Sequence, residues 1–240
     1  MKILFYRIYQ FCIAMPLLLA ATILAALTTI VGSMLGMSRS FGYWPGHYWA
    51  RIFCVLNFVR VKVSGRENFD KNTSYVFVAN HQGAFDIFSI YGYLGHNFRW
   101  MMKKSLEKIP LVGYSCRVSG HIYVDNSTPS ATRLTMETAE KRLAGGLSVV
   151  VFPEGSRSRD GRIHAFRRGA FQLAMEFNLP VIPVTIDGAY RVMPRGTVLP
   201  RFGTIHLTVH KPIYAPEGGR HELSHLMERS FEAVASALPQ

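Results

Sequence analysis

Residues 74–86 read SYVFVANHQGAFD, and this stretch decides the fold. Its first part, residues 74–80, is rich in β-branched and aromatic residues and carries no charge, which is typical of a strand buried inside a sheet. The polar run NHQG follows at residues 80–83, and a helical pattern begins at residue 85. In α/β sheets, the loop between the end of a strand and the start of a helix is where ligands bind.

The alternation of strand and helix continues along the chain. Further runs rich in β-branched residues are predicted to be strands, at residues 59–63, 98–102, 121–125, 147–152, 180–187 and 204–210. Helical patterns are predicted at residues 85–94, 105–117, 130–144, 167–178 and 219–238. We therefore expect an α/β fold with a mainly parallel sheet flanked by helices. Residues 59–240 are enough to bury a proper core as one domain.

Residues 1–58 are predicted to form a membrane-anchoring helical segment. No charged residue lies between Arg7 and Arg39, and residues 11–31 are almost entirely apolar. About twenty such residues in a helix span a hydrocarbon core of ~30 Å. A secretory signal peptide is the alternative, with Lys2 and Arg7 as its charged start, but the apolar run is longer than a signal core usually is. Because positive charge flanks the segment on both sides, the sequence leaves open whether it spans the bilayer, forms a hairpin or lies in one leaflet.

Residues 41–58, FGYWPGHYWARIFCVLNF, extend this apolar region with many aromatic residues. Arg51 is the only Lys, Arg, Asp or Glu among them. Rings with an apolar body and a polar tip sit well at the level of lipid headgroups. The alternative is an aromatic helix that is buried in the soluble domain.

Composition and charge narrow the classes of partner. The 240 residues are 49% hydrophobic, which excludes a disordered chain, and the formal net charge of +12 suggests a polyanionic partner. We expect an acidic lipid surface and no nucleic acid, because the aromatic residues cluster in the apolar segment and not among the basic residues. The three cysteines are far apart, so we expect reduced thiols facing a cytosol-like compartment.

His81 and Asp86 are the first candidate site residues. Along a regular helix, residues five apart point about 140° away from each other, so a contact between them needs a tight turn, which Gly83 permits. Such a contact would fix the imidazole tautomer and make His81 a general base. The alternative is that Asp86 merely begins a helix and His81 is an ordinary loop residue. The local sequence does not decide between these interpretations.

Residues 152–161, FPEGSRSRDG, follow another apolar strand and form the second candidate site. Gly155 lets backbone approach a ligand, and arginine forms paired hydrogen bonds with phosphate oxygens. The run RRG at residues 167–169 opens the next predicted helix, whose N-terminus would itself attract an anion. The alternative is an ordinary charged surface loop.

Residues 221–225, HELSH, match the HExxH signature of zinc proteases. On a helical wheel, His221, His225, Glu228 and Glu232 share the face opposite the apolar one, so we expect them to meet water. The chain also ends fifteen residues later, which leaves little room for a third ligand. We therefore expect no metal site there.

Taken together, the ordered blocks resemble the glycerolipid acyltransferase family of the lysophosphatidate (1-acylglycerol-3-phosphate) type. The matching blocks are NHx4D at 80–86, KKxL…IP…G at 103–113, FPEGSRS at 152–158 and VIPV at 181–184. One block departs from the family pattern, because residues 120–126 read GHIYVDN and Asn126 stands where arginine is expected. Arg117 and Arg133 are candidates to replace the lost phosphate contact. Another acceptor, a lyso-ornithine lipid or a lysophospholipid, remains an alternative.

The resemblance implies direct acyl transfer with no covalent enzyme intermediate. His81, oriented by Asp86, would take the proton from the sn-2 hydroxyl of lysophosphatidate. The oxygen would then attack the thioester of acyl-CoA or an acyl-carrier protein, giving phosphatidic acid. Backbone donors around the turn at 81–86 are candidates for stabilising the tetrahedral oxyanion.

The resemblance also implies how the substrate is held. The residues expected to bind the glycerol phosphate are Glu154, Gly155, Ser156 and Arg157, with Lys104 as a second phosphate ligand. No cofactor or metal is needed, because a thioester is already activated. The bilayer is the expected partner, with the site facing the cytoplasm, at the inner membrane if the source is bacterial. A non-catalytic protein that binds acidic lipid is the alternative from a different class.

Overall fold

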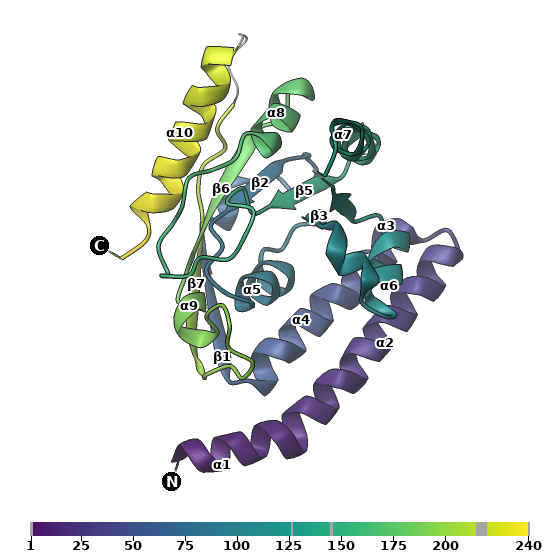
Figure 1. The fold of residues 1–240 in the computed structure, drawn as a ribbon, viewed down its shortest axis with the longest axis vertical. Coiled ribbons are helices and arrows are strands. Elements are labelled where there is room, and N and C mark those ends of the chain that lie inside the picture. The colour runs from purple at the N-terminus through teal and green to yellow at the C-terminus, as the bar shows by residue number, and fades with distance from the viewer. Residues whose placement is uncertain (1, 126, 145, 215–219, 240) are drawn as a thin grey trace.

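A seven-stranded sheet forms the centre of the computed structural model, which describes residues 2–125, 127–144, 146–214 and 220–239 (Figure 1). Its strand order is β1-β7-β6-β2-β5-β3-β4. The strands are β1 (Val59–Ser64), β2 (Val76–Ala79), β3 (Phe98–Lys103), β4 (Ile122–Val124), β5 (Ser148–Val151), β6 (Val181–Asp187) and β7 (Gly203–Val209). Each coincides with a predicted strand. The predicted α/β fold with a mainly parallel sheet is confirmed.

The pair β6–β7 is the one antiparallel pairing between the named strands. A parallel pair needs a crossover of a dozen or more residues, usually through a long helix. Between β6 and β7 the chain forms only the four-residue α9 (Ala189–Val192) before a loop, so β7 returns beside β6 in the opposite direction.

Helices cover both faces of the sheet. The main helices after β1 are α5 (Phe85–Tyr93), α6 (Val112–Val118), α7 (Pro129–Ala144), α8 (Gly169–Glu176) and α10 (Arg220–Ser236). The predicted helix over 105–117 is wrong in its middle. A 3-10 turn at Lys104–Lys108 ends at Ile109, whose backbone is extended as is usual before a proline, and α6 begins only at Val112.

The core has two halves, one on each face of β2. Phe77 and Ala79 pack with residues of α4 (Trp44–Leu56) and α5, while Val76 and Val78 pack with residues of α7, α8 and α10. All four strand residues are fully buried. Burial on both faces explains why this strand reads as a continuous apolar run.

The N-terminal segment is helical from α1 (Lys2–Tyr9) through a π-helical turn (Gln10–Ala14) to α2 (Met15–Met34). The turn ends two residues before Pro16, which cannot donate a backbone hydrogen bond, and the amide of Met15 donates to the carbonyl of Gln10. By length and composition, residues 3–34 could cross a membrane, with a mean hydropathy of 2.3. Figure 1 shows α1 and α2 lying along one side of the domain.

Contacts along its length dock this helix on the body. Near its start, the hydroxyl of Tyr6 donates to the carbonyl of Asn57 at 3.0 Å, and in the middle Trp49 Nε1 donates to Thr22 Oγ1 at 2.9 Å. Helix α2 also packs against α4 and α6. In α4, His47, Ala50 and Cys54 are buried. The aromatic segment therefore has a buried face, as the alternative interpretation expected.

Arg99 fastens the turn after α2 to the sheet. This side chain on β3 is 1% exposed, and burial lowers its pKa to about 10. Its guanidinium donates to the carbonyl of Ser119 at 2.7 Å and to that of Ser38, at the start of α3 (Ser38–Phe41), at 2.8 Å. Carbonyl oxygens of the helical segment and of the loop after α6 thus share one buried cation.

Arg99→Leu should destabilise the fold strongly, because it removes the charge-assisted hydrogen bonds that this buried guanidinium donates to the carbonyls of Ser119 and Ser38. We expect a loss of about 3 kcal/mol in the free energy of unfolding, or roughly 6–10 °C in the melting temperature. Thermal unfolding in detergent measures this. The control is Arg133→Leu, whose arginine is exposed and paired only with Glu137. If both variants had the melting temperature of the wild type, the stabilising role of Arg99 would be refuted.

Candidate active site

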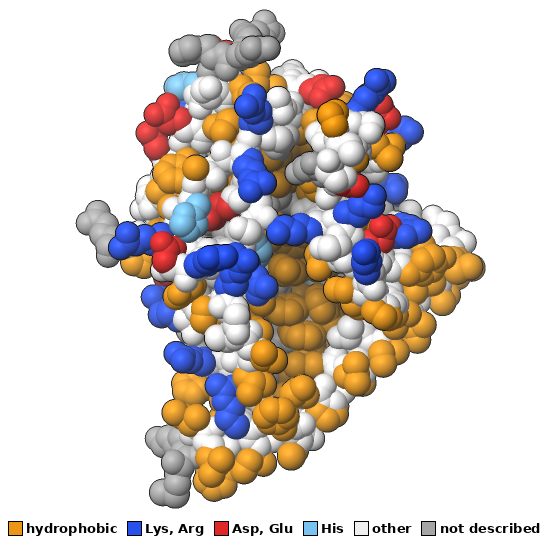
Figure 2. All heavy atoms as spheres, in the orientation of Figure 1, with side chains coloured by type: hydrophobic (Ala, Val, Ile, Leu, Met, Phe, Trp, Pro, Cys, Tyr) orange, Lys and Arg blue, Asp and Glu red, His pale blue; other side chains and the backbone are white. Residues whose placement is uncertain are grey.

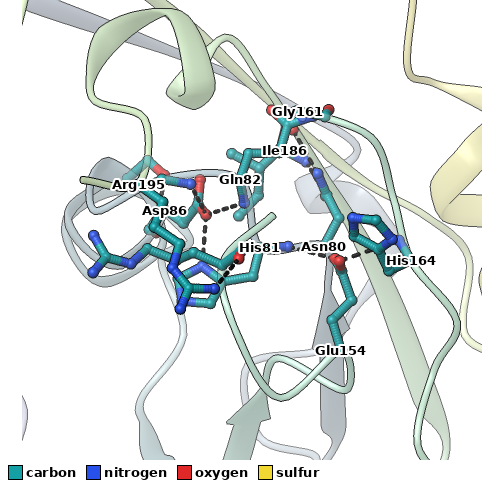
Figure 3. A network of polar contacts seen from close by, with 12 residues as sticks. Asn80, His81, Gln82, Asp86, Glu154, Gly161, His164, Ile186 and Arg195 are labelled. Atoms are coloured by element: carbon teal, nitrogen blue, oxygen red, sulfur yellow. Dashed lines mark hydrogen bonds and ion pairs between the residues drawn. The ribbon is translucent and has the colours of Figure 1, made fainter. Parts of the chain in front are cut away.

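His81 and Asp86 meet across a tight turn at the end of β2 (Figure 3). His81 Nδ1 lies 2.7 Å from Asp86 Oδ2, and the carboxylate is fully buried. The same oxygen accepts the backbone N–H of Gln82 at 2.6 Å and that of Gly83 at 2.8 Å. The sequence left open whether His81 contacts Asp86 or is an ordinary loop residue, and the structure shows the contact.

Gly83 is required there for space. A Cβ at this position would lie 2.6 Å from the carbonyl oxygen of Met193 and 2.7 Å from that of Ala189, both of which belong to rigid backbone. Gly83 also pairs with Pro194 in an isolated antiparallel bridge. The turn is therefore pressed against the chain that follows β6.

The hydrogen bonds fix the tautomer of His81. Asp86 Oδ2 accepts two backbone donors, so it is an acceptor toward the imidazole as well, and Nδ1 carries the proton. The other nitrogen, Nε2, has no hydrogen-bond partner among the described residues. In the neutral ring Nε2 then holds the free lone pair, which is what a general base needs. The ring itself stacks on Phe152, with centroids 4.0 Å apart.

Asn80 locks the strand end that carries this turn. Its Nδ2 donates to the carbonyl of Ile186 at 2.9 Å, and its Oδ1 accepts the amide of Ile186 at 2.8 Å. The side chain is fully buried. This paired contact joins the ends of β2 and β6, so the turn at His81 begins from a fixed point.

Glu154 joins the loop after β5 to the turn after β2. One carboxylate oxygen accepts the amide of His81 at 2.7 Å, and the other accepts the amide of His164 at 3.1 Å. Burial raises the pKa of this carboxyl group, against the effect of the two amide bonds. Because both oxygens already face backbone donors, the geometry gives Glu154 a role in holding the loops.

The loop at 152–161 lies beside the turn because β2 and β5 are parallel neighbours. The amide of Ser158 donates to the carbonyl of His81 at 2.7 Å. Gly155 adopts a left-handed backbone, with φ of +77°, next to the guanidinium of Arg167. Ser156 is exposed and Arg157 is half-buried. The two predicted strand-end loops therefore meet at one edge of the sheet.

Arg195 is a residue of this region that the sequence did not single out. Its Nη1 donates to the carbonyl of Arg157 at 3.3 Å, and Figure 3 shows its side chain beside His81. Among the described residues, neither the guanidinium of Arg157 nor that of Arg195 pairs with a carboxylate. No motif marks Arg195, because folding alone brings the loop after α9 next to the turn.

Lys104 lies at the end of β3, which is the next strand after β5 in the sheet. It is exposed and forms an ion pair with Asp125 at 2.7 Å, and this hydrogen bond raises the pKa of the lysine. Asn126 lies outside the described residues. The two candidate replacements are both paired: Arg117 with Glu107 and Arg133 with Glu137.

Figure 2 shows the surface over this edge of the sheet. Lys and Arg side chains gather above a hollow lined by apolar side chains, in the region where Figure 1 places α4 and α5. A cationic rim above an apolar hollow suits an amphipathic ligand with an anionic head.

The HExxH match at residues 221–225 lies only partly within the described residues. His225, Glu228 and Glu232 are exposed on α10, as expected, while the side chain of His221 lies outside the described residues. Among the described residues, no group of three or more His, Cys, Asp or Glu side chains is placed to hold a metal ion.

Comparison with known proteins identifies the family. The family model described as Acyltransferase matches residues 60–187, more than half of the chain. The chain belongs to the acyltransferase family. The matched range holds both loops of the site, including His81, Asp86 and Glu154.

Individual relatives of this chain carry more specific names. It is 32% identical, over 73% of its length, to the chloroplastic 1-acyl-sn-glycerol-3-phosphate acyltransferases BAT2 of Brassica napus and LPAT1 of Arabidopsis thaliana. It spans about half the length of these two proteins, 51% and 49%. The crystal structure of the 1-acyl-sn-glycerophosphate (LPA) acyltransferase PlsC from Thermotoga maritima superposes with a TM-score of 0.77 at 25% identity, covering 99% of this chain and 98% of that one.

Glu154→Ala should loosen the site, because the backbone N–H groups of His81 and His164 would lose their acceptor. We expect a loss of about 3 kcal/mol in the free energy of unfolding, together with faster proteolysis within residues 154–165. Glu176→Ala, at an exposed position at the end of α8, is the control and should stay within about 0.5 kcal/mol of the wild type. Equal stability of the two variants would show that Glu154 does not hold the loops.

Proposed function

We propose that this chain transfers a fatty acyl group from a thioester donor to the sn-2 hydroxyl of 1-acyl-sn-glycerol-3-phosphate, giving phosphatidic acid. The observation that carries the proposal is the imidazole of His81. Its Nδ1 is held by a buried carboxylate, and its Nε2 has no partner in the part of the chain that the structure describes. The guanidinium groups of Arg157 and Arg195 lie at the same edge, and neither pairs with a carboxylate in that part of the chain. The names of the plant and Thermotoga relatives support the same reaction.

His81 acts as the general base in this reaction. Its Nε2 takes the proton of the sn-2 hydroxyl while that oxygen attacks the carbonyl carbon of the thioester. The tetrahedral intermediate collapses with cleavage of the carbon–sulfur bond, and the departing thiolate takes the proton from the imidazolium. Asp86 stabilises the transient positive charge on the ring, as a buried carboxylate does next to a histidine. No metal or cofactor takes part in these steps.

The oxyanion needs donors other than the first four amides of the turn. The amides of His81, Gln82 and Gly83 already donate to carboxylates, and that of Ala84 donates to the carbonyl of Met193 at 3.4 Å. These four amides are therefore already hydrogen-bonded within the fold, and the role of backbone donors around the turn at 81–86 in stabilising the oxyanion stays a prediction. Their bonds hold the turn in place.

The phosphate of the acceptor binds at Arg157 and Arg195 in this proposal. In lysophosphatidate only two carbon atoms and one oxygen separate the sn-2 oxygen from the phosphorus, so a hydroxyl at His81 brings the phosphate close to both guanidinium groups. Gly155 and Ser156 line the same loop, while Glu154 holds it. Lys104 can join as a second phosphate ligand if it exchanges Asp125 for the substrate.

The bilayer supplies the acceptor and takes up the product. The first acidic residue of the chain is Glu67, so the whole helical segment before it carries only positive charge. Because α1 and α2 are docked along the body, we propose that they lie in one leaflet, with the site facing the cytoplasm. The donor is acyl-CoA or an acyl-carrier protein.

His81→Ala and Asp86→Asn should each lower kcat/KM by at least ~10²-fold, because general-base catalysis contributes that much. The assay offers labelled acyl-CoA or acyl-carrier protein against a panel of lyso-lipids that includes lysophosphatidate and lyso-ornithine lipid. His206→Ala, at an exposed histidine on β7, is the control. A folded His81→Ala enzyme with normal turnover would exclude this mechanism, and wild-type preference for another lyso-lipid would exclude the acceptor.

Arg157→Ala and Arg195→Ala should each raise the KM for lysophosphatidate about tenfold or more, because each removes a charge-assisted bond to phosphate. The KM for the donor should change little. Arg191→Ala serves as the control, since this exposed arginine pairs with Asp187. A rise confined to the donor's KM would place the thioester substrate at these arginines.

A further inference from the structure

The loop between α9 and β7 exposes apolar side chains although its backbone is ordered. Residues 193–202 read MPRGTVLPRF and contain no acidic residue. Val198 is 81% exposed and Phe202 is 64% exposed. The amide of Thr197 donates to the carbonyl of Pro194 at 3.2 Å, and that of Arg201 donates to the carbonyl of Val192 at 2.8 Å. The fold therefore fixes these apolar side chains in contact with solvent.

Helix α1 holds this loop in place. Arg7 Nη1 and Gln10 Nε2 both donate to the carbonyl of Pro200, at 3.1 and 3.0 Å. The ring of Tyr6 packs edge-on against Phe202, with centroids 5.6 Å apart. The exposed side chains of the loop thus continue the exposed apolar surface of α1, which includes Leu4, Phe5 and Ile8.

A cavity of about 350 Å³ lies between the loop and the helix. Its lining combines two guanidinium groups and a hydroxyl with apolar side chains: Arg7, Thr197 and Arg201 with Val192, Pro194, Val198 and Leu199. Cations and hydroxyl donors suit a phosphodiester, and the apolar part suits the first carbons of acyl chains.

We infer that residues 193–202 and Arg7 form a second bilayer contact that takes the headgroup of an anionic phospholipid. This inference specifies how the chain contacts the membrane, and it rests on the proposed function. The loop is joined directly to the catalytic turn, since Pro194 pairs with Gly83 and the amide of Ala84 donates to the carbonyl of Met193. Contact of the loop with the bilayer therefore holds the turn of His81 at the depth of the headgroups.

Charge favours a bilayer over a second copy of the chain as the occupant. Arg7 and Arg201 line the cavity together with the exposed Val198, and residues 188–202 hold no carboxylate to balance them. In a symmetric dimer through this surface, like charges would face each other, which costs free energy. Anionic lipid headgroups complement the same charges.

The test measures vesicle binding of the full-length protein without substrates. The double variant Val198→Asp/Phe202→Asp should need about tenfold or more lipid for half-binding to vesicles of equal parts phosphatidylcholine and phosphatidylglycerol. The control is Leu134→Asp on α7, whose leucine is 64% exposed and should not affect binding. The double variant should keep its turnover on a short-chain acceptor dispersed as monomers. Binding equal to that of the control would overturn the inference.

A label at the loop tests insertion without a destabilising charge. Val198→Cys, in a Cys12→Ser background, carries an environment-sensitive fluorophore whose emission should shift to the blue on these vesicles, while the same label at Leu134→Cys should not shift. An equal shift on vesicles of pure phosphatidylcholine would overturn the role of anionic headgroups. A dimer that Val198→Asp dissociates, with vesicle binding unchanged, would assign the surface to a second copy. Because no substrate is used, vesicle binding and label emission do not depend on whether the chain transfers acyl groups.

Discussion

One oxygen atom, Asp86 Oδ2, organises the site. It accepts the imidazole N–H of His81 and the amides of Gln82 and Gly83, all within 2.8 Å. A carboxylate that is fully removed from water needs such donors to offset the loss of its hydration. The turn after β2 therefore folds around Asp86. The hydrogen bond from His81 Nδ1 to Asp86 Oδ2 then sets the tautomer of His81.

Further contacts connect this turn to the neighbouring loops. Glu154 connects the turn to the loop after β5, and Pro194 connects it to the loop after α9. Arg7 of α1 and Gln10 of the π-helical turn then reach the latter loop through the carbonyl of Pro200. A chain of contacts thus joins the apolar N-terminal helix to the imidazole of His81.

The sequence predicted the seven strands well, because a strand buried on both faces must be apolar and β-branched almost throughout. It also placed His81 and Arg157 at one edge of the sheet, since the ends of parallel strands meet there. It was wrong at residues 109–111, where the predicted helix over 105–117 is interrupted, although Pro110 was visible as a break. It could not assign the antiparallel direction of β7 or the place of Arg195, which depend on how a loop folds back.

Hydrogen-bond partners were the least predictable part of the site. Glu154 belongs to a block expected to bind phosphate, yet its oxygens face two backbone amides. The amides of residues 81–84, in the turn expected to serve an oxyanion, already have acceptors. Residue type and spacing tell which groups gather at a site, but a buried polar group first binds whatever donor or acceptor the fold brings within reach.

The central claim is that Asp86 holds the proton on Nδ1 of His81 and leaves Nε2 free. Nitrogen NMR of the histidine side chains, with His81 assigned by comparison with His81→Ala, measures this directly. We expect a protonated Nδ1 and an unprotonated Nε2 in the neutral ring, and loss of that preference in Asp86→Ala. A neutral His81 that carries its proton on Nε2, or that exchanges equally between the two nitrogens, would contradict the account.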